Sequence, residues 1–188
     1  MPRVLGCDQS LTSFGAARAS STSEVELHRW RPGVLRGEAR LQWLLDKVEE
    51  AAEGCDFIVM EGLAFGAKGS SLLDLAGLYW ALRLRLWQRG IPFAVVPPSS
   101  RAKYVTGRGN ASKEDCFVDT VHRFPAVDVR GNDQADALVL AAMGLDWAGC
   151  PLVAMPAAHR VALTAVVKGK PAIEWPALKV AQEVPSGS

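Results

Sequence analysis

The sequence predicts one α/β domain built on a mixed five-stranded sheet with helices on both faces. Two observations carry this prediction: short apolar runs that end in an acid, and segments of helical period between them. The expected order is three strands, helix, strand, helix, strand, helix, helix, which pairs some strands in parallel. With 188 residues, 49% of them hydrophobic, the chain can build one core. We expect residues 1–150 to form this domain and residues 151–188 to be a C-terminal extension that packs on it or trails from it.

The first strand is expected at the start of the stretch from Val4 to Gly15. Its apolar residues lead to Asp8, and a polar turn with Ser10 and Ser13 follows. A buried strand that delivers an acid to its own end can hold a metal-binding carboxylate rigidly. An Asp that merely begins a turn has the same pattern, so Asp8 alone leaves both readings open.

Two more strands and a helix follow. Residues 16–19 and 25–30 are predicted strands, and residues 38–52 have the leucine spacing of an amphipathic helix. Residues 56–61 form an uninterrupted apolar run that ends at Glu61, which is typical of a central strand buried on both faces.

The next helix is expected at residues 70–89. Its apolar residues lie nearly all the way round, so two of its sides should be covered. Deep packing within the monomer and a homodimer contact both account for this pattern.

The last third of the domain contains one strand and two helices. Residues 92–96 are a predicted strand, and residues 99–110 are a polar, basic connection. A helix should begin at about Ser112. Asp115 lies near the start of this helix, an arrangement close to a capping box. Asn132 is expected to be the N-cap of a second helix that runs to Met143.

The C-terminal part is less regular. Residues 161–167 are expected to form one more strand, with a turn at 168–170.

Four acids stand at the ends of these elements, at a strand end or in the first turn of a helix: Asp8, Glu61, Asp133 and Asp136. If the first and fourth strands are neighbours, these carboxylates meet at one edge of the sheet and repel one another. A divalent cation removes the repulsion, and oxygen ligands favour Mg²⁺, for which Mn²⁺ can substitute. Two such ions about 3.5–4 Å apart can hydrolyse a phosphodiester. Structural acids at caps are the alternative, above all for Asp133, whose charge suits a helix N-terminus.

These motifs resemble the RuvC family of Holliday-junction resolvases. The resemblance covers roughly residues 4–145, in the family's order and spacing, and it is carried by segments 8–15, 59–61, 107–113 and 133–138. It implies an RNase H-like fold, a homodimer, dependence on Mg²⁺ and paired nicks in four-way DNA junctions. It also implies that Asp8, Glu61, Asp133 and Asp136 are the catalytic, metal-binding acids. Gln9, where a proline is usual, and the unmatched residues beyond 150 indicate a bacteriophage or divergent member.

DNA contacts are expected on the loops that leave the same sheet edge. By the resemblance, Lys113 reaches the DNA backbone, and Phe65 lies close to the position of an aromatic that stacks on junction bases. Further basic residues on these loops can neutralise phosphates; they are Lys68, Arg101, Lys103 and Arg108. Ordinary solvated charges, and a core position for Phe65, remain the alternatives.

Two other functions fit parts of the pattern. The strand, Asp and small polar turn at residues 8–15 also occur in ATP-binding proteins of the actin and sugar-kinase superfamily, although 188 residues are few for two such lobes. A branched-DNA binding protein that does not cut would keep the fold, but four retained acids argue against it.

Composition sets the remaining expectations. The net charge of +1 does not by itself indicate a nucleic-acid partner. The four cysteines form no Cys-x-x-Cys pair, so they are expected to be reduced thiols of a cytoplasmic protein. No stretch has the roughly 20 apolar residues of a membrane span, and no signal peptide is visible.

Overall fold

The structure is a computed structural model that describes residues 1–22, 24–63 and 70–177. It confirms the mixed five-stranded sheet, whose strand order is β3-β2-β1-β4-β5. Pairs β1–β2 and β2–β3 are antiparallel, whereas β1–β4 and β4–β5 are parallel. The strands are β1 (Arg3–Asp8), β2 (Phe14–Ser20), β3 (Val25–Trp30), β4 (Phe57–Glu61) and β5 (Phe93–Val96).

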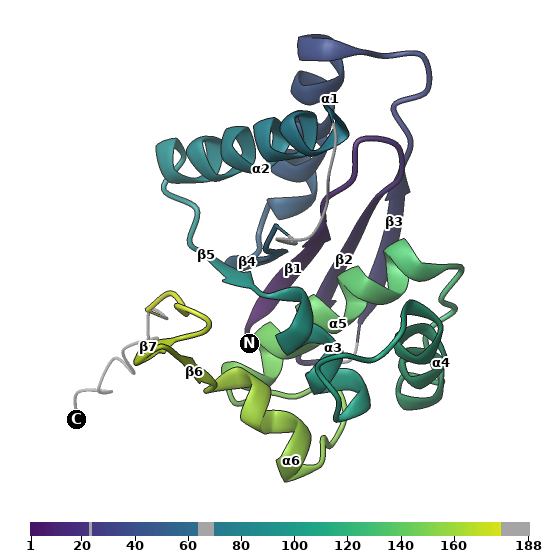
Figure 1. Cartoon of the computed structure of the whole chain (residues 1–188), viewed down its shortest axis with the longest axis vertical. Coiled ribbons are helices and arrows are strands. Elements are labelled where there is room, and N and C mark those ends of the chain that lie inside the picture. The colour runs from purple at the N-terminus through teal and green to yellow at the C-terminus, as the bar shows by residue number, and fades with distance from the viewer. Residues whose placement is uncertain (23, 64–69, 178–188) are drawn as a thin grey trace, which may run out of the picture.

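Helices cover both faces of this sheet. The larger helices are α1 (Gly37–Ala52), α2 (Ser70–Gln88), α3 (Pro98–Thr106), α4 (Lys113–Arg123) and α5 (Asn132–Trp147). Figure 1 shows α1 and α2 on one side of the sheet and α3, α4 and α5 on the other. Strand residues alternate between the two layers: Leu5 and Ile58 pack with α1 and α2, while Val4 and Val59 pack with α5.

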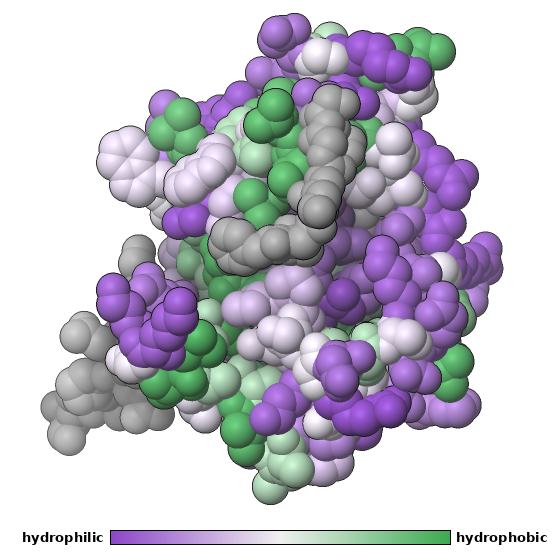
Figure 2. Space-filling view, in the orientation of Figure 1, coloured by the Kyte–Doolittle hydropathy of each residue, from purple (hydrophilic) through white to green (hydrophobic). Residues whose placement is uncertain are grey.

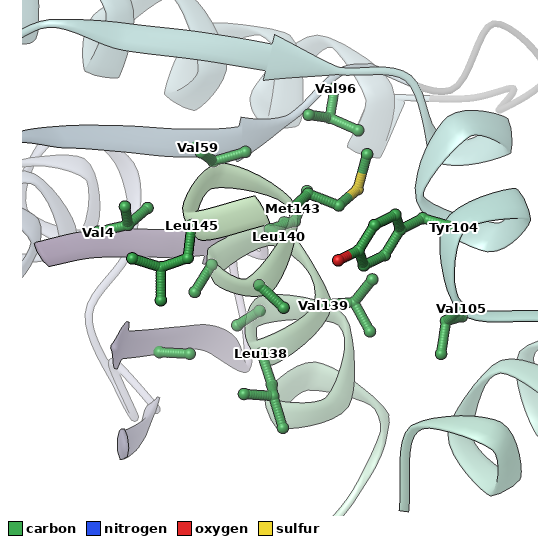
Figure 3. Packing of buried hydrophobic residues seen from close by; sticks show 14 of the residues in the cluster. Val4, Val59, Val96, Tyr104, Val105, Leu138, Val139, Leu140, Met143 and Leu145 are labelled. Atoms are coloured by element: carbon green, nitrogen blue, oxygen red, sulfur yellow. The ribbon is translucent and has the colours of Figure 1, made fainter. Parts of the chain in front are cut away.

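Helix α5 lies at the centre of the second layer. All its residues from Ala135 to Asp146 are buried, because the sheet covers one side and α3, α4 and the C-terminal segment cover the others. In Figure 3, Val139 and Met143 of α5 point toward Tyr104 of α3, while Val4 and Val59 lie on the sheet side. The helix is one turn longer than predicted, since burial on every side leaves no polar stripe to mark its end.

The basic connection predicted at residues 99–110 is largely helical instead. Helix α3 begins with Pro98 in its first turn and ends at Gly107, whose φ of 82° is the left-handed C-cap conformation. Ala102 and Val105 face the core, three residues apart, and Arg101 is buried with them. The interspersed cations hid this helical period in the sequence.

The C-terminal segment also differs from its prediction. Where one strand was expected at residues 161–167, the chain forms α6 (Ala157–Arg160), a 3₁₀ turn (Val161–Leu163) and a short hairpin of β6 (Val166–Val167) and β7 (Lys170–Pro171). The predicted turn is present at 168–169.

Residues 151–177 pack on the sheet domain through a buried ionic contact. Asp146 of α5 accepts hydrogen bonds from the Tyr104 hydroxyl at 3.0 Å and from Arg160, whose Nη2 lies 2.8 Å from Oδ1. The Trp175 ring stacks on Trp147 with 5.2 Å between ring centroids. Both contacts attach the C-terminal segment to α5. None of the helices in the described ranges has both the length and the apolar character needed to cross a membrane.

The stability of the fold should depend on Gly6. A Cβ at this position would collide with the Ala137 carbonyl oxygen and lie 2.6 Å from the Ala141 nitrogen, both in the backbone of α5. We expect Gly6→Ala to destabilise the protein by about 1–3 kcal/mol, because strand and helix must separate. Thermal unfolding measures this loss. Gly77→Ala is the control, since a Cβ there meets no atom within 4 Å and should be neutral or slightly stabilising. Equal unfolding temperatures for Gly6→Ala and the wild type would contradict the close approach.

Candidate active site

Two of the predicted acids come together through the parallel pairing of β1 and β4. Cys7 pairs with Met60, so the next residues, Asp8 and Glu61, leave the two strands at adjacent positions. The central strand order therefore brings together carboxylates that are 53 positions apart in the sequence. This is the arrangement that the two apolar runs predicted.

Helix α5 brings the other two acids to the same edge. Its backbone touches β1 at Gly6 and β2 at Gly15, where a Cβ would collide with the carbonyl group of Asp133. Asp136, one turn further along, is buried and interacts electrostatically with Asp8 and Glu61. The absence of side chains at the two glycines lets the first turn of α5 reach the end of β1.

Asp133 is held by neighbours that were not predicted. The Ser13 hydroxyl donates to its Oδ2 at 2.5 Å, and Nε of Arg29 lies 3.5 Å from the same oxygen. Arg29 also donates to the Arg130 carbonyl just before the helix. The N-cap is Gly131 rather than Asn132. The polar turn after β1 and the end of β3 thus orient this carboxylate.

Arg101 lies among the acids instead of on an exposed loop. Its Nε donates to Oε1 of Glu61 at 2.5 Å, and its Nη1 donates to Oδ1 of Asp136. The side chain is only 8% exposed. This contact was not predicted, because residues 99–110 were expected to be a loop. The spacing of Ala102 and Val105 was the available signal, since Arg101 lies one turn before Val105 and so shares its face.

The site strongly disfavours negative charge. Burial raises the pKa of Asp8 well above its usual range, and the charges of Glu61 and Asp136 raise it further. Burial also raises the pKa of Asp136 to about 6, although Arg101 acts in the opposite direction. Such acids gain from an added cation, and carboxylate oxygens suit Mg²⁺ or Mn²⁺.

The side chains as they stand do not form a finished metal cage. Among the described residues, no three His, Cys, Asp or Glu side chains surround one point closely enough to hold an ion. The guanidinium of Arg101 lies between Glu61 and Asp136 and bonds to both. The donor chemistry therefore fits a divalent metal, while the present spacing of the carboxylates fits an arginine.

The predicted DNA-binding residues divide into three groups. Arg108 and Lys113 are exposed, after α3 and at the start of α4, and Arg108 forms an ion pair with Asp115 at 3.1 Å. Lys103 is half-buried on α3. Phe65 and Lys68 lie outside the described residues. Lys113 acts electrostatically on Asp136, so this exposed cation lies near the acids.

The predicted cap of α4 is confirmed. Ser112 is its N-cap and accepts a hydrogen bond from the backbone N–H of Asp115 at 3.0 Å. This cap fixes the start of the helix, and therefore the position of Lys113 beside the acids.

The sheet topology, with acids at the ends of β1 and β4 and on the crossing helix, defines an RNase H-like fold. Within that class, the chain has the RuvC-like fold. It is similar to the structure of RuvC from Thermus thermophilus, with a TM-score of 0.64 and 17% identity over 79% of this chain and 98% of that one. The similarity to T. thermophilus RuvC in complex with a Holliday junction substrate gives a TM-score of 0.65 and 14% identity, over 83% and 100%. No family model and no curated protein matches the chain in sequence.

Because the Asp8 carboxylate is repelled by its neighbours, removing its charge should stabilise the fold. A carboxyl group with a raised native pKa favours folding at low pH, and this contribution is lost as the pH rises through that pKa. Without metal, Asp8→Asn should therefore raise the unfolding temperature at pH 7, with a smaller gain at pH 5.

Thermal unfolding in a chelating buffer at the two pH values measures this difference. Asp46→Asn is the matched control, because the Asp46 side chain is 57% exposed on α1 and should change stability little. A lower unfolding temperature for Asp8→Asn at pH 7 would show that the Asp8 carboxylate is not under strain.

Proposed function

We propose that this chain is a Mg²⁺-dependent endonuclease that resolves Holliday junctions by paired phosphodiester nicks. The observation that carries the proposal is the meeting of Asp8, Glu61 and Asp136 at one edge of an RNase H-like sheet. Burial raises the pKa of Asp8 and Asp136, which costs stability, so the meeting of the acids is best explained by a cation that they bind. Asp133 completes the proposed ligand set.

The protein's contribution is to place these ligands. Strand pairing fixes Asp8 beside Glu61, and the close contact of α5 with β1 fixes Asp136. Ser13 and Arg29 orient Asp133 through the contacts described above. Two bound ions would activate a water molecule and stabilise the leaving oxygen of the phosphodiester.

DNA is the proposed substrate because cations lie beside the acids. Lys113 is exposed and acts on Asp136, Arg108 is exposed after α3, and Lys103 is half-buried on α3. These three residues would contact phosphates, which positions a strand without reading its sequence. The similar T. thermophilus RuvC is described with a Holliday junction substrate, which supports a branched DNA as the substrate of this chain.

A homodimer would supply the second nick, and α2 offers the surface for it. Leu78, Leu82 and Leu86 of this helix are buried. The opposite face is exposed in the monomer, so deep packing within one chain does not explain its apolar residues. This face comprises Leu73, Trp80, Leu84 and Trp87, which are 76%, 60%, 54% and 73% exposed.

Figure 2 shows hydrophobic side chains at the surface over α2, among hydrophilic ones. An exposed apolar helix face of this kind is typical of a protein interface. Two copies joined there would carry two sites, in keeping with the near two-fold symmetry of a four-way junction.

Cleavage of branched DNA tests the enzyme directly. Four-way, three-way, flap and linear duplex substrates are incubated side by side with Mg²⁺ or with a chelator. We expect paired nicks in the four-way junction only with the metal, and a loss of at least about 100-fold in Asp8→Asn with junction binding retained.

The Asp46→Asn variant should cut at the wild-type rate. Junction binding without Mg²⁺-dependent cleavage by the wild type would support the non-cutting alternative instead. Normal cleavage by Asp8→Asn would show that the acids are not the active site.

The dimer is tested by charge on the exposed face of α2. We expect the double change Leu73→Glu and Leu84→Glu to convert dimers to monomers, because paired faces would bury like charges. Analytical ultracentrifugation measures the mass in solution. Val34→Glu is the control, since Val34 is 91% exposed in the loop between β3 and α1 and is not part of this face. A monomeric wild type would rule out this interface.

A further inference from the structure

Arg101 forms the central contact of the acid cluster. One guanidinium donates to two of the acids, through Nε to Glu61 and through Nη1 to Asp136. The side chains of Arg101, Glu61 and Asp136 are 8%, 17% and 12% exposed, so water screens these ion pairs poorly. Arg101 also lowers the electrostatic cost of the charge on Asp8.

The guanidinium and a divalent ion would need the same two carboxylates. Mg²⁺ binds carboxylate oxygens at about 2.0–2.1 Å, in near-octahedral geometry. A guanidinium nitrogen 2.5 Å from Oε1 of Glu61 occupies one oxygen of that carboxylate and places a positive charge beside any ion bound to it. The spacing of the acids agrees, because the described residues include no set of three such ligands around one point.

Only the side chain of Arg101 needs to move to free these oxygens. The backbone of α3 is fixed by Ala102, Tyr104 and Val105, which are packed into the core. An arginine side chain has several rotatable bonds, so it can leave the acids without any change in the fold.

We propose that Arg101 is an internal competitor of the divalent metal: it offsets part of the charge of Glu61 and Asp136 until metal binds, and metal binding requires its guanidinium to leave. The inference rests on the proposed function, since it concerns the same metal site. It differs from a simple positioning role, in which Arg101 would hold the acids in place for the metal. The two roles predict opposite effects when the arginine is removed.

Metal affinity separates these roles. Calorimetric titration with Mn²⁺ is carried out on the full chain without DNA, for the wild type and Arg101→Gln. If Arg101 competes with the metal, Arg101→Gln should bind Mn²⁺ on the order of tenfold more tightly. If it positions the acids, the variant should bind more weakly. Equal or weaker binding by Arg101→Gln overturns the proposal.

A second readout is the stability of the protein. In chelator, Arg101→Gln should unfold at a lower temperature than the wild type, because the acids lose their counter-ion. Saturating Mn²⁺ should then raise its unfolding temperature by more than it raises that of the wild type. A smaller rise in the variant counts against the proposal.

Two further variants keep the test sharp. Arg101→Lys retains the charge but cannot bridge two carboxylates in the same way, so it should bind Mn²⁺ more tightly than the wild type, and this comparison holds even if Arg101→Gln does not fold. If Arg101→Lys bound Mn²⁺ no more tightly than the wild type, the proposal would be overturned. Arg89→Gln is the matched control, because Arg89 also donates to a glutamate, Glu49 at 2.7 Å, but is 62% exposed at the end of α2. It should bind Mn²⁺ like the wild type.

Failure of the proposed function gives a different result. If neither the wild type nor any Arg101 variant binds Mn²⁺, the acids are not a metal site. If the wild type binds Mn²⁺ and Arg101→Gln binds no better, the metal site stands and only the competition is wrong.

Discussion

The repulsion among buried carboxylates at the ends of β1 and β4 is the constraint on which the rest of the structure depends. Asp8 ends β1, in which the residues from Val4 to Cys7 are all buried. Its pKa is raised most by burial and further by the charges of Glu61 and Asp136. A protein does not gather such groups for stability, because each added charge makes the next more costly. The arrangement is favourable only with a cation, and Arg101 supplies one to Glu61 and Asp136.

The backbone geometry shows how tightly the acids are forced together. Helix α5 approaches β1 and β2 at Gly6 and Gly15, and it approaches β1 and β4 at its own Gly144, where a Cβ would lie 2.8 Å from Val4 and Val59. Ordinary side chains at these positions would hold the helix away from the sheet. The glycines therefore allow the close approach of α5 to the sheet, and this approach sets the distance between Asp136 and the strand that carries Asp8.

Features whose cause lies within a few residues were predictable from the sequence. The apolar run that ends at Glu61 predicted β4, and the spacing of the leucines predicted α1. The neighbouring positions of Asp8 and Glu61 followed once two parallel strands were assumed to be adjacent. The burial of Arg101 depends on α3 packing against α5, which no local pattern shows. The contacts of Asp133 with Ser13 and Arg29 depend likewise on tertiary structure, and so does the partial exposure of α2.

The charges proposed for the site would allow Arg101 to pair first with the acids and later with the substrate. Four carboxylates and two divalent ions would neutralise each other, so a guanidinium left among them would be a surplus charge with no partner. A phosphodiester brought to the same ions adds one negative charge. Arg101, once displaced from Glu61 and Asp136, could then pair with that phosphate, which is the kind of partner predicted for it from the sequence. The same cation would thus offset part of the acids' charge before metal binds and the charge of the substrate afterwards.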